Sequence, residues 1–452
     1  MRLRGTMRVN EAGHLEIGGC DTVELAERFG TPLYVLDEAA FTGRVQELAA
    51  AFDAAYPGEV ALVYAGKAFL TTGFARLLAA EGLWLDVASG GELYTAQAGG
   101  FPPGRIVVHG NNKSEQELRM SLEAGVARLV VDNLQELERL IAMTAGRPVA
   151  TRLYLRLRPG IPVHTHNHMR TGQEDSKFGL GPEEAFQAVE RLRTVDHLEL
   201  AGLHAHLGSQ LRDPEPYRRL AQRMVAWLEE LGKAYGRPLE ELDLGGGWGV
   251  AYRETDPEPP VELWAQAVGQ AVAEAARARG LALPRLLVEP GRSAIAAAGT
   301  TLYRVGAVKV IPGVRRYVVT DGGIYENARV AMYGTAYEAA AASKMNDPAL
   351  NAVPTRVVGK NCESGDVLAD DVALPALEPG DLLAVPVTGA YHYAMASNYN
   401  RLPRPAVVVV YQGEAELLVE RESYEDLIRH DRIPARWSQA APALRESVSR
   451  TP

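Results

Sequence analysis

Lys67 follows a run of β-forming residues, Ala61–Tyr64, at the end of an expected strand, and its amine could do covalent chemistry. A strand of this composition is expected to be buried, and burying an ammonium group costs several kcal/mol unless a partner compensates it. One use for such a lysine is condensation with an aldehyde to form a Schiff base. The alternative is a side chain that has left the strand and reaches water, and this segment alone does not decide between the two.

Two glycine-containing turns could bind a phosphate group. Gly245-Gly246-Gly247 follows one predicted strand, and Pro290-Gly291-Arg292 follows the next. Glycine exposes backbone N–H groups that bind anions, and β/α barrels favour this position, after strands seven and eight, for phosphate. Ser209 could add a hydroxyl group. Because turns use glycine freely, ordinary turns remain the alternative.

Glu289 ends the apolar strand just before the second of these turns. It could form a salt bridge at the barrel rim, or it could hold a proton on a heteroaromatic nitrogen and so turn a pyridine ring into an electron sink. An amine, a phosphate site and a buried carboxylate are together what pyridoxal 5'-phosphate requires. The sequence therefore predicts this cofactor.

Histidine pairs suggest a competing interpretation. The segment His164–His168 and the pair His204 and His206 both resemble metal ligands, and a barrel with such a pair can be a metal-dependent amidohydrolase. The first segment, however, continues into a polar, glycine-containing loop that would hold a metal poorly. His206 could instead lie flat against a cofactor ring, so we favour pyridoxal phosphate and predict no metal.

Cys362 is followed by Glu363, Ser364, Gly365 and Asp366. A lone cysteine is most often a small core residue, but a polar, glycine-containing surrounding favours an exposed thiol that could donate a proton. The only other cysteine is far away in the sequence, so no disulfide framework is expected.

The elements that must position these residues alternate between strands and helices from about residue 60 to residue 292. About eight such repeats favour a parallel (β/α)8 barrel, with an open doubly wound sheet as the alternative. Barrel enzymes carry their chemistry at the C-terminal ends of the strands. The expected strand ends are all polar, charged or glycine-rich: Lys67, Asp86, His109, Asn133, Arg156, His206–Ser209, Gly245–Gly247 and Glu289–Arg292.

Beyond the barrel the pattern changes to strands separated by turns, which predicts a mainly antiparallel β domain. We expect residues 1–44 to belong with the β domain, residues 45–295 to form the barrel, residues 296–436 to form the β domain, and residues 437–452 to be a disordered tail. The chain has 452 residues, 47% of them hydrophobic, and a net charge of -10, so nucleic acid is not an expected partner. No signal peptide or membrane-spanning stretch is recognisable, which favours a cytoplasmic protein.

The motifs as a set resemble the diaminopimelate decarboxylases, which are fold-type III pyridoxal-phosphate enzymes with an alanine racemase-like barrel and a β domain. The resemblance covers about residues 20 to 430. The segments that carry it are Tyr64–Lys67, Asp86–Leu93, His109–Lys113, Ser176–Gly179, His204–Gln210, Glu289–Arg292, Cys362–Ser364 and Gly389–Tyr391.

This resemblance implies that Lys67 carries the cofactor as a Schiff base, that His206 stacks on its ring and that Glu289 pairs with the pyridine nitrogen. Cys362 would protonate the carbon from which carbon dioxide has left, in the active site of the partner subunit of a homodimer. The implied cofactor-binding residues are Lys67, Asp86, His206, Ser209, Gly246, Gly247, Glu289, Pro290, Gly291, Arg292 and Tyr391.

The resemblance also implies decarboxylation of meso-2,6-diaminopimelate to L-lysine, the last step of lysine biosynthesis. The implied substrate-binding residues are Arg292, Arg329, Tyr333, Glu363 and Tyr391. The distal end of this substrate carries an ammonium and a carboxylate, so its site needs both signs of charge. A decarboxylase of ornithine, arginine or a carboxylated polyamine precursor is the alternative, and a regulatory pseudoenzyme is a second. We expect the loop His164–Gln173 to cover the site.

Overall fold

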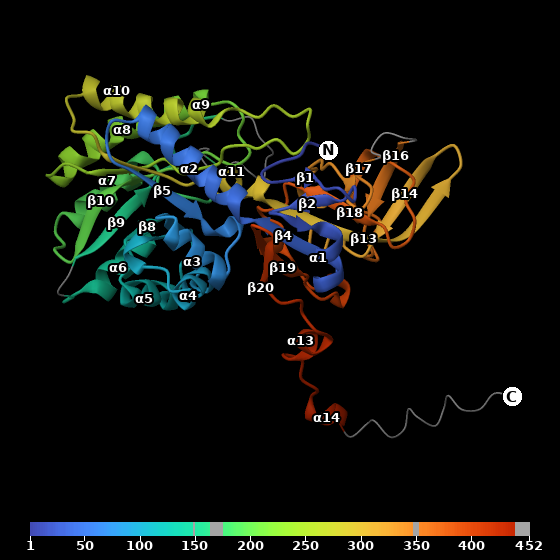
Figure 1. Cartoon of the computed structure of the whole chain (residues 1–452). Helices are drawn as coiled ribbons and strands as arrows, with labels where there is room; N and C mark the ends of the chain where they lie inside the picture. The colour runs from blue at the N-terminus through green and yellow to red at the C-terminus, as the bar shows by residue number, and fades with distance from the viewer. Residues whose placement is uncertain (148–149, 163–174, 347–351, 439–452) are drawn as a thin grey trace.

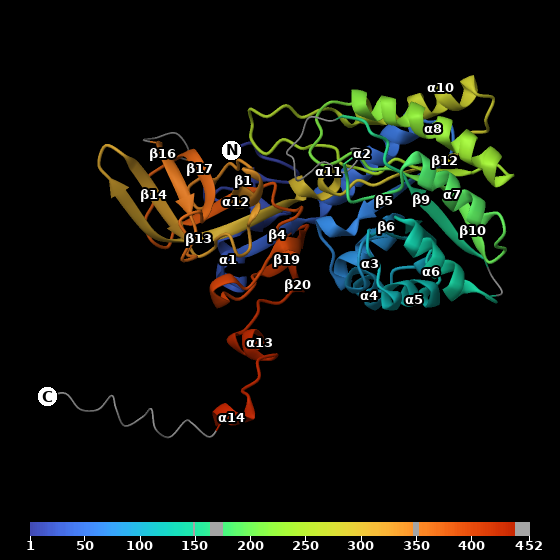
Figure 2. The same cartoon turned by 180° about the vertical axis from the view of Figure 1, so that it is seen from behind.

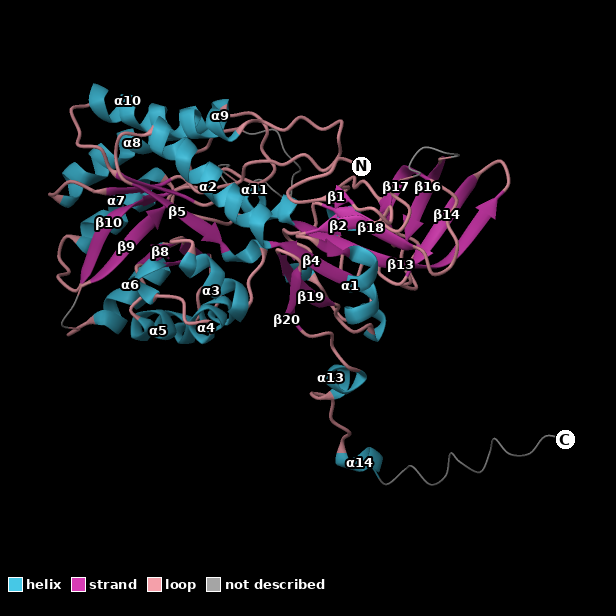
Figure 3. Ribbon diagram, viewed as in Figure 1, coloured by secondary structure: helices cyan, strands magenta, loops and turns pink. Residues whose placement is uncertain are grey.

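The chain folds into a helix-covered barrel beside a domain built mainly of strands (Figures 1 and 3). The computed structural model describes residues 1–147, 150–162, 175–346 and 352–438. The loop predicted to cover the site, with His164, His166 and His168, therefore lies outside the described residues. No helix in the described ranges is both long and apolar enough to cross a membrane. The cytoplasmic location stays a prediction.

Eight parallel strands close the barrel, as the alternation in the sequence predicts. Each strand pairs with the next along the chain, and β12 pairs with β5, so the alternative of an open sheet is wrong. The strands are β5 (Val60–Ala65), β6 (Trp84–Val87), β7 (Ile106–Val108), β8 (Arg128–Val131), β9 (Thr151–Arg156), β10 (Leu198–His204), β11 (Glu241–Asp243) and β12 (Arg285–Val288).

Helices surround the barrel, and their ends follow local sequence signals. Ser114 caps α5 in a reciprocal box with Glu117, and Gly125 ends it in the left-handed conformation, with φ 67°, where glycine carries no Cβ penalty. The barrel helices are α2 (Glu38–Ala55), α3 (Thr72–Ala80), α4 (Gly90–Ala98), α5 (Glu115–Ala124), α6 (Leu134–Thr144), α7 (Pro182–Leu192), α8 (Glu215–Tyr235), α9 (Val261–Ala265), α10 (Ala271–Ala278) and α11 (Arg292–Ile295).

The interior of the barrel has an apolar layer below a polar one. Side chains of successive strand residues point to opposite faces, so a residue two positions beyond an inward-facing one also faces inward. Buried residues in the apolar layer include Val107 on β7 and Leu287 on β12. Two residues further on, His109 follows β7 and Glu289 follows β12 at the C-terminal rim of the barrel. The sequence period of the strands thus brings polar side chains together at one end.

The β domain contains a sheet in the order β17-β16-β14-β13-β4-β19-β20, to which β18 and β15 are attached. Most pairs are antiparallel, although β14 with β16 and β4 with β19 are parallel. Its strands are β4 (Leu33–Asp37), β13 (Gly299–Ile311), β14 (Arg315–Thr320), β15 (Ala340–Ala341), β16 (Val353–Val358), β17 (Val367–Leu374), β18 (Leu382–Pro386), β19 (Ala406–Tyr411) and β20 (Glu414–Val419).

The N-terminal segment contributes to this domain. Its strand β4 lies between β13 and β19, and β1 (Arg8–Val9), β2 (Leu15–Ile17) and β3 (Cys20–Asp21) form a small sheet of their own before α1 (Thr22–Phe29). The short helix α12 (Arg329–Tyr333) follows β14. The four predicted domain ranges themselves stay predictions.

Two short helices follow β20 at the C-terminal end. Both α13 (Tyr424–Ile428) and α14 (Ala435–Ser438) lead away from the β domain in the two opposite views of Figures 1 and 2. Residues 439–452 lie outside the described part of the chain, so the predicted disorder of the tail is not tested.

Candidate active site

A cavity of about 400 Å³ opens where the C-terminal ends of the barrel strands meet the β domain. Eight of the residues predicted for the site line it. Its lining residues are Lys67, Ala88, His109, Gly110, Arg156, Lys177, Phe178, His204, His206, Ser209, Glu289, Arg292, Arg329, Tyr333, Tyr391 and Met395.

Lys67 lies in the turn directly after β5, and its side chain keeps 45% of its surface exposed toward this cavity. Its Nζ atom is 3.5 Å from Oδ2 of Asp86, which is buried at the end of the neighbouring strand β6. Burial lowers the pKa of Lys67, but the carboxylates of Asp86 and Glu289 more than offset this effect and hold the pKa above its ordinary value. The pair therefore stabilises a positively charged nitrogen at the mouth of the barrel.

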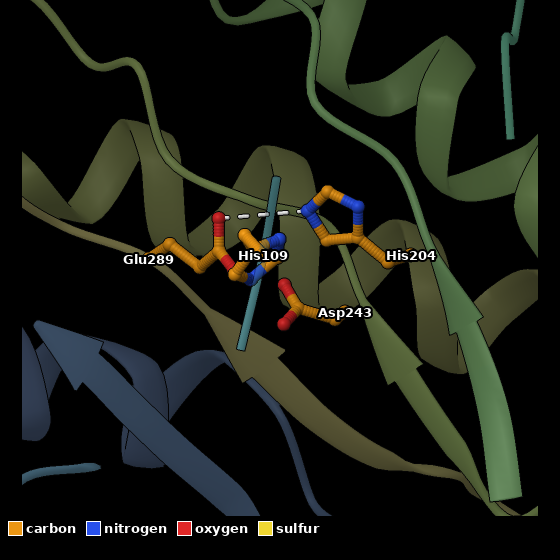
Figure 4. A group of neighbouring side chains, drawn as sticks. All are labelled: His109, His204, Asp243 and Glu289. Atoms are coloured by element: carbon orange, nitrogen blue, oxygen red, sulfur yellow. Dashed lines mark ion pairs between the residues drawn. The ribbon is translucent and has the colours of Figure 1, made fainter. Parts of the chain in front are cut away.

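Glu289 lies at the floor of the cavity with two histidines from the other strand ends (Figure 4). Nε2 of His109 is 2.6 Å from one carboxylate oxygen, and Nε2 of His204 is 3.5 Å from the other. Burial raises the pKa of Glu289, but the two histidines outweigh burial and bring the pKa well below its usual range. The side chain is therefore a buried anion that faces the same cavity as Lys67.

His206 and the glycine turn form one wall of the cavity. The Gly246 N–H donates to Nδ1 of His206 over 3.3 Å, which orients the ring. Burial and the nearby Lys67 lower the pKa of His206 well below its usual value, so the ring is neutral. At Gly247, with φ +99°, a Cβ atom would lie 1.8 Å from the carbonyl oxygen of Gly208. Only glycine lets the two turns approach so closely.

Two buried arginines line the cavity, one from the barrel and one from the β domain. Arg292, the first residue of α11, donates to Oγ of Ser209 over 2.9 Å and to the hydroxyl of Tyr252. Arg329 begins α12 in the β domain and stacks on Tyr333, with 4.9 Å from its guanidinium carbon to the ring centre. Both guanidinium groups also lie over the ring of Tyr391, at 4.7 Å and 5.6 Å. Fixed, buried guanidinium groups are suited to binding carboxylate or phosphate.

Cys362 and Glu363 do not line this cavity. Cys362 is exposed on the surface of the β domain, and its N–H donates to Oδ1 of Asn400 over 2.8 Å. Glu363 is also exposed. If either residue serves an active site, it is one formed with another subunit.

Comparison with known proteins identifies the family. Residues 42–296 match the model of the pyridoxal-dependent decarboxylase family, pyridoxal binding domain. A diaminopimelate decarboxylase of Bacillus subtilis is 46% identical over 434 residues, which cover 95% of this chain and 98% of the relative. The chain belongs to the diaminopimelate decarboxylase family. The crystal structure of a family member from M. jannaschii in complex with L-lysine is similar, with a TM-score of 0.88 and 33% identity over 95% of this chain and 98% of that one.

A lysine/ornithine decarboxylase of Vibrio vulnificus is less similar. Its structure, in complex with putrescine, has a TM-score of 0.72 and 27% identity, and the match covers 86% of this chain and 98% of that one. The fold is thus that of a wider group, whereas the higher identity is to the diaminopimelate enzymes. Membership in this family decides against the metal-dependent amidohydrolase and the pseudoenzyme.

The residues at the site fit pyridoxal phosphate. A lysine amine opens to the cavity, an anionic carboxylate lies at its floor, and a hydroxyl, a guanidinium group and glycine turns gather at one wall. The predicted residues Gly246, Pro290 and Gly291 shape this wall through their backbone: a Cβ on Gly246 would lie 1.8 Å from the carbonyl oxygen of Glu289. Asp86, at 3.5 Å from Nζ of Lys67, supplies a negative charge next to this amine.

The sequence analysis left several residues of the site out of its list. His109 and Arg156 appeared there as strand ends, His109 also as part of a motif, and Lys177 and Phe178 only as part of a motif. His204 was weighed as a metal ligand and was otherwise named only as part of a motif. Asp243 was not considered at all, although it lies beside Glu289 and His204 (Figure 4). Counting back by two from His206 and from Gly245 gives His204 and Asp243 as positions on the same faces of their strands, but only the closed barrel brings these side chains to Glu289.

Proposed function

We propose that this protein decarboxylates meso-2,6-diaminopimelate to L-lysine and carbon dioxide. The observation that carries the proposal is the pair of buried arginines, Arg292 and Arg329, that face Tyr391 in the cavity that Lys67 enters. Relatives that match along nearly the whole chain are diaminopimelate decarboxylases. Lysine biosynthesis is the pathway that such an enzyme completes.

Residues at the rim of the barrel would hold the cofactor. Lys67 would bind its aldehyde carbon covalently, with Asp86 as the counter-ion of the nitrogen. Ser209, Arg292 and the backbone of Gly246, Gly247, Pro290 and Gly291 would bind its phosphate, with Tyr391 beside it. When bound, pyridoxal phosphate supplies an electron sink for the electron pair that departing carbon dioxide leaves behind.

Two further side chains of the barrel would tune the bound ring. Glu289, held as an anion by its histidines, would accept a hydrogen bond from the ring nitrogen and keep that nitrogen protonated. His206 would lie against the ring face, where the bond from Gly246 to its Nδ1 fixes its orientation. A neutral imidazole can pack there without repelling a positively charged ring.

Substrate selection would depend on the distal end of diaminopimelate, which survives as the amino-acid end of lysine. Arg329 and Arg292 would bind its carboxylate, with the hydroxyls of Tyr333 and Tyr391 nearby. Glu363 from a partner would bind its ammonium group. Ornithine and arginine have no carboxylate at that end, and a buried guanidinium group left without its anion disfavours them.

The proton donor would come from a second subunit. Cys362 is exposed and does not line the cavity of its own subunit, yet the reaction needs a proton at the carbon that carbon dioxide has left. We infer a homodimer in which Cys362 of one subunit enters the active site of the other. Location in the cytoplasm is part of the same proposal.

Product analysis tests this function. The purified protein with pyridoxal phosphate should convert diaminopimelate to L-lysine with one carbon dioxide released per lysine formed, as measured by chiral chromatography and gas release. Lys67→Ala should form neither product. Release of carbon dioxide without lysine, or lysine formation by Lys67→Ala at the wild-type rate, would overturn the proposal.

A further inference from the structure

Asp243 is a fully buried carboxylic acid for which the proposed reaction has no role so far. It ends β11, and its Oδ1 accepts the N–H of Gly245 over 2.9 Å. Its Oδ2 has no hydrogen-bond donor among the described residues. One carboxylate oxygen each of Asp243 and Glu289 and one ring nitrogen each of His109 and His204 all lie within 4.8 Å of one another. Figure 4 shows the Asp243 carboxylate beside this group.

Two buried carboxylates this close cannot both be ionised without a large cost. One of the two must keep a proton, and their surroundings differ. Glu289 faces both imidazoles, which stabilise its anion. Asp243 has only the backbone N–H of Gly245 on one oxygen. Burial and the Glu289 carboxylate raise the pKa of Asp243 well above its ordinary value, so the proton belongs on Asp243.

We propose that Asp243 is a positioning residue, which donates a hydrogen bond through its protonated carboxyl group to Glu289 and thereby holds Glu289 in place as an anion aimed at the cofactor ring. This inference rests on the role proposed for Glu289. The acid needs no contact with the cofactor, because it acts through Glu289. The Gly245 N–H fixes one oxygen, which leaves the other as the donor.

The charged and titratable groups around Asp243 come from several strands. They are Glu289 on the loop after β12, His109 after β7, His204 on β10, Tyr154 and Arg156 on β9, and Asp86 on β6. Because groups other than Asp243 also contribute to the pH dependence of the site, the test compares variants at each pH rather than relying on one titration of the wild type. Loss of the Asp243 proton would place a second anion beside Glu289.

Two substitutions separate the hydrogen bond from the space that the side chain fills. Asp243→Asn keeps the shape, can donate its amide N–H to Glu289 and can accept from Gly245, but it never deprotonates. Asp243→Ala removes both bonds. Asp132→Asn is the matched control, because Asp132 is another buried carboxylate, at the end of β8, whose oxygen accepts the Gly179 N–H instead.

The measurements are the dissociation constant of pyridoxal phosphate and the absorption spectrum of the bound cofactor, from about pH 7 to about pH 10. At neutral pH we expect Asp243→Asn to bind within about threefold of the wild type. Asp243→Ala should bind about tenfold or more weakly, the size typical of outer-shell partners. Toward alkaline pH the wild type should weaken more steeply than Asp243→Asn, while Asp132→Asn follows the wild type.

Two results would overturn the inference: Asp243→Asn binding as weakly as Asp243→Ala at neutral pH, or wild type and Asp243→Asn showing the same pH dependence. Asp243→Asn keeps the test valid even if Asp243→Ala does not fold. A wild type that binds no pyridoxal phosphate would contradict the proposed function itself. If the wild type binds pyridoxal phosphate and all variants show the same dissociation constant at each pH, only the role assigned to Asp243 would be wrong.

Discussion

The imidazole of His109 and the carboxylate of Glu289 meet with 2.6 Å between Nε2 and Oε1, at the ends of β7 and β12. Both side chains are more than nine-tenths buried. Removing His109 would take away the shorter of the two imidazole contacts of the buried Glu289 carboxylate, which is costly. The contact therefore keeps Glu289 anionic where a pyridine ring would need it.

His204, on the other side of Glu289, gives the folded protein a specific pH dependence. Burial lowers the pKa of His204 to about 3, although Glu289 opposes this effect. As pH falls below about 6.5, the unfolded chain takes up a proton on His204 that the folded protein does not accept until near pH 3. Stability from this residue is thus present above about pH 6.5 and is lost as pH falls through that window.

We expect His204→Gln to lose less stability than the wild type between about pH 7 and about pH 5. Over this range the free energy of unfolding of the wild type should fall by about 2 kcal/mol more than that of His204→Gln, at about 1.4 kcal/mol for each pH unit below 6.5. Thermal unfolding of the protein without cofactor at the two pH values measures it. His197→Gln, at a partly exposed histidine that bonds Ile141, is the control. Equal acid sensitivity of wild type and His204→Gln would show that His204 accepts its proton in the folded state.

Lys67 should be the sole covalent attachment point of pyridoxal phosphate. Lys177 lines the same cavity and makes a matched control, because both lysines carry the same amine. Borohydride reduction followed by peptide mass spectrometry should place the cofactor on Lys67 in wild type and in Lys177→Ala, and on no residue in Lys67→Ala. Cofactor found on Lys177 in the wild type would contradict the assignment.

Arg329 should select for the distal carboxylate. Arg329→Met leaves this carboxylate without its buried partner, so kcat/KM for diaminopimelate should fall by about 100-fold or more, from the roughly 2–5 kcal/mol that such a loss costs. Inhibition by L-lysine, which keeps the carboxylate, should weaken in parallel, whereas inhibition by cadaverine, which lacks it, should change little. Arg315→Met, at a surface arginine paired with Asp370, controls for loss of charge. Equal weakening of both inhibitors would mean that Arg329 supports the fold rather than reads the carboxylate.

Mixing two inactive variants tests whether Cys362 serves the partner subunit. In a heterodimer of Lys67→Ala with Cys362→Ala, one site has lost both groups and the other has kept both. With random exchange about half the dimers are mixed, so about a quarter of wild-type activity should return, a combinatorial expectation for two-subunit sites. A mixture of Lys67→Ala with His206→Ala damages every site once and should stay inactive. No recovery in the first mixture would place Cys362 in its own subunit or outside the reaction.

Much of the fold and of the site could be predicted from the sequence, because local patterns determine both. The strand runs, the caps at Ser114 and Gly125 and the polar strand ends follow from short stretches of chain. The cluster around Glu289 could not be predicted this way, since it depends on how strands far apart in sequence align in the closed barrel. Asp243 looks like any strand residue until β11 lies beside β12.

The β domain shows the same division. Single strands such as β13 and β19 follow from composition, but the insertion of β4 between them joins residue 35 to residues 300 and 408, which no local pattern encodes. The position of Arg329 likewise depends on contacts between parts of the chain that are far apart in sequence. Its role was inferred from resemblance alone, and only the folded chain brings it to Tyr391 and the barrel rim.

Carbon dioxide release from separate substrates tests the central claim most directly. The wild-type protein with pyridoxal phosphate would be given diaminopimelate, ornithine, arginine and lysine in turn, and kcat/KM would be measured for each. The structure predicts release from diaminopimelate, with the three others at least about 100-fold lower, because only diaminopimelate has both a carboxylate to lose and a distal carboxylate for the arginines. Release from ornithine or arginine at a rate equal to or above that from diaminopimelate would contradict the claim.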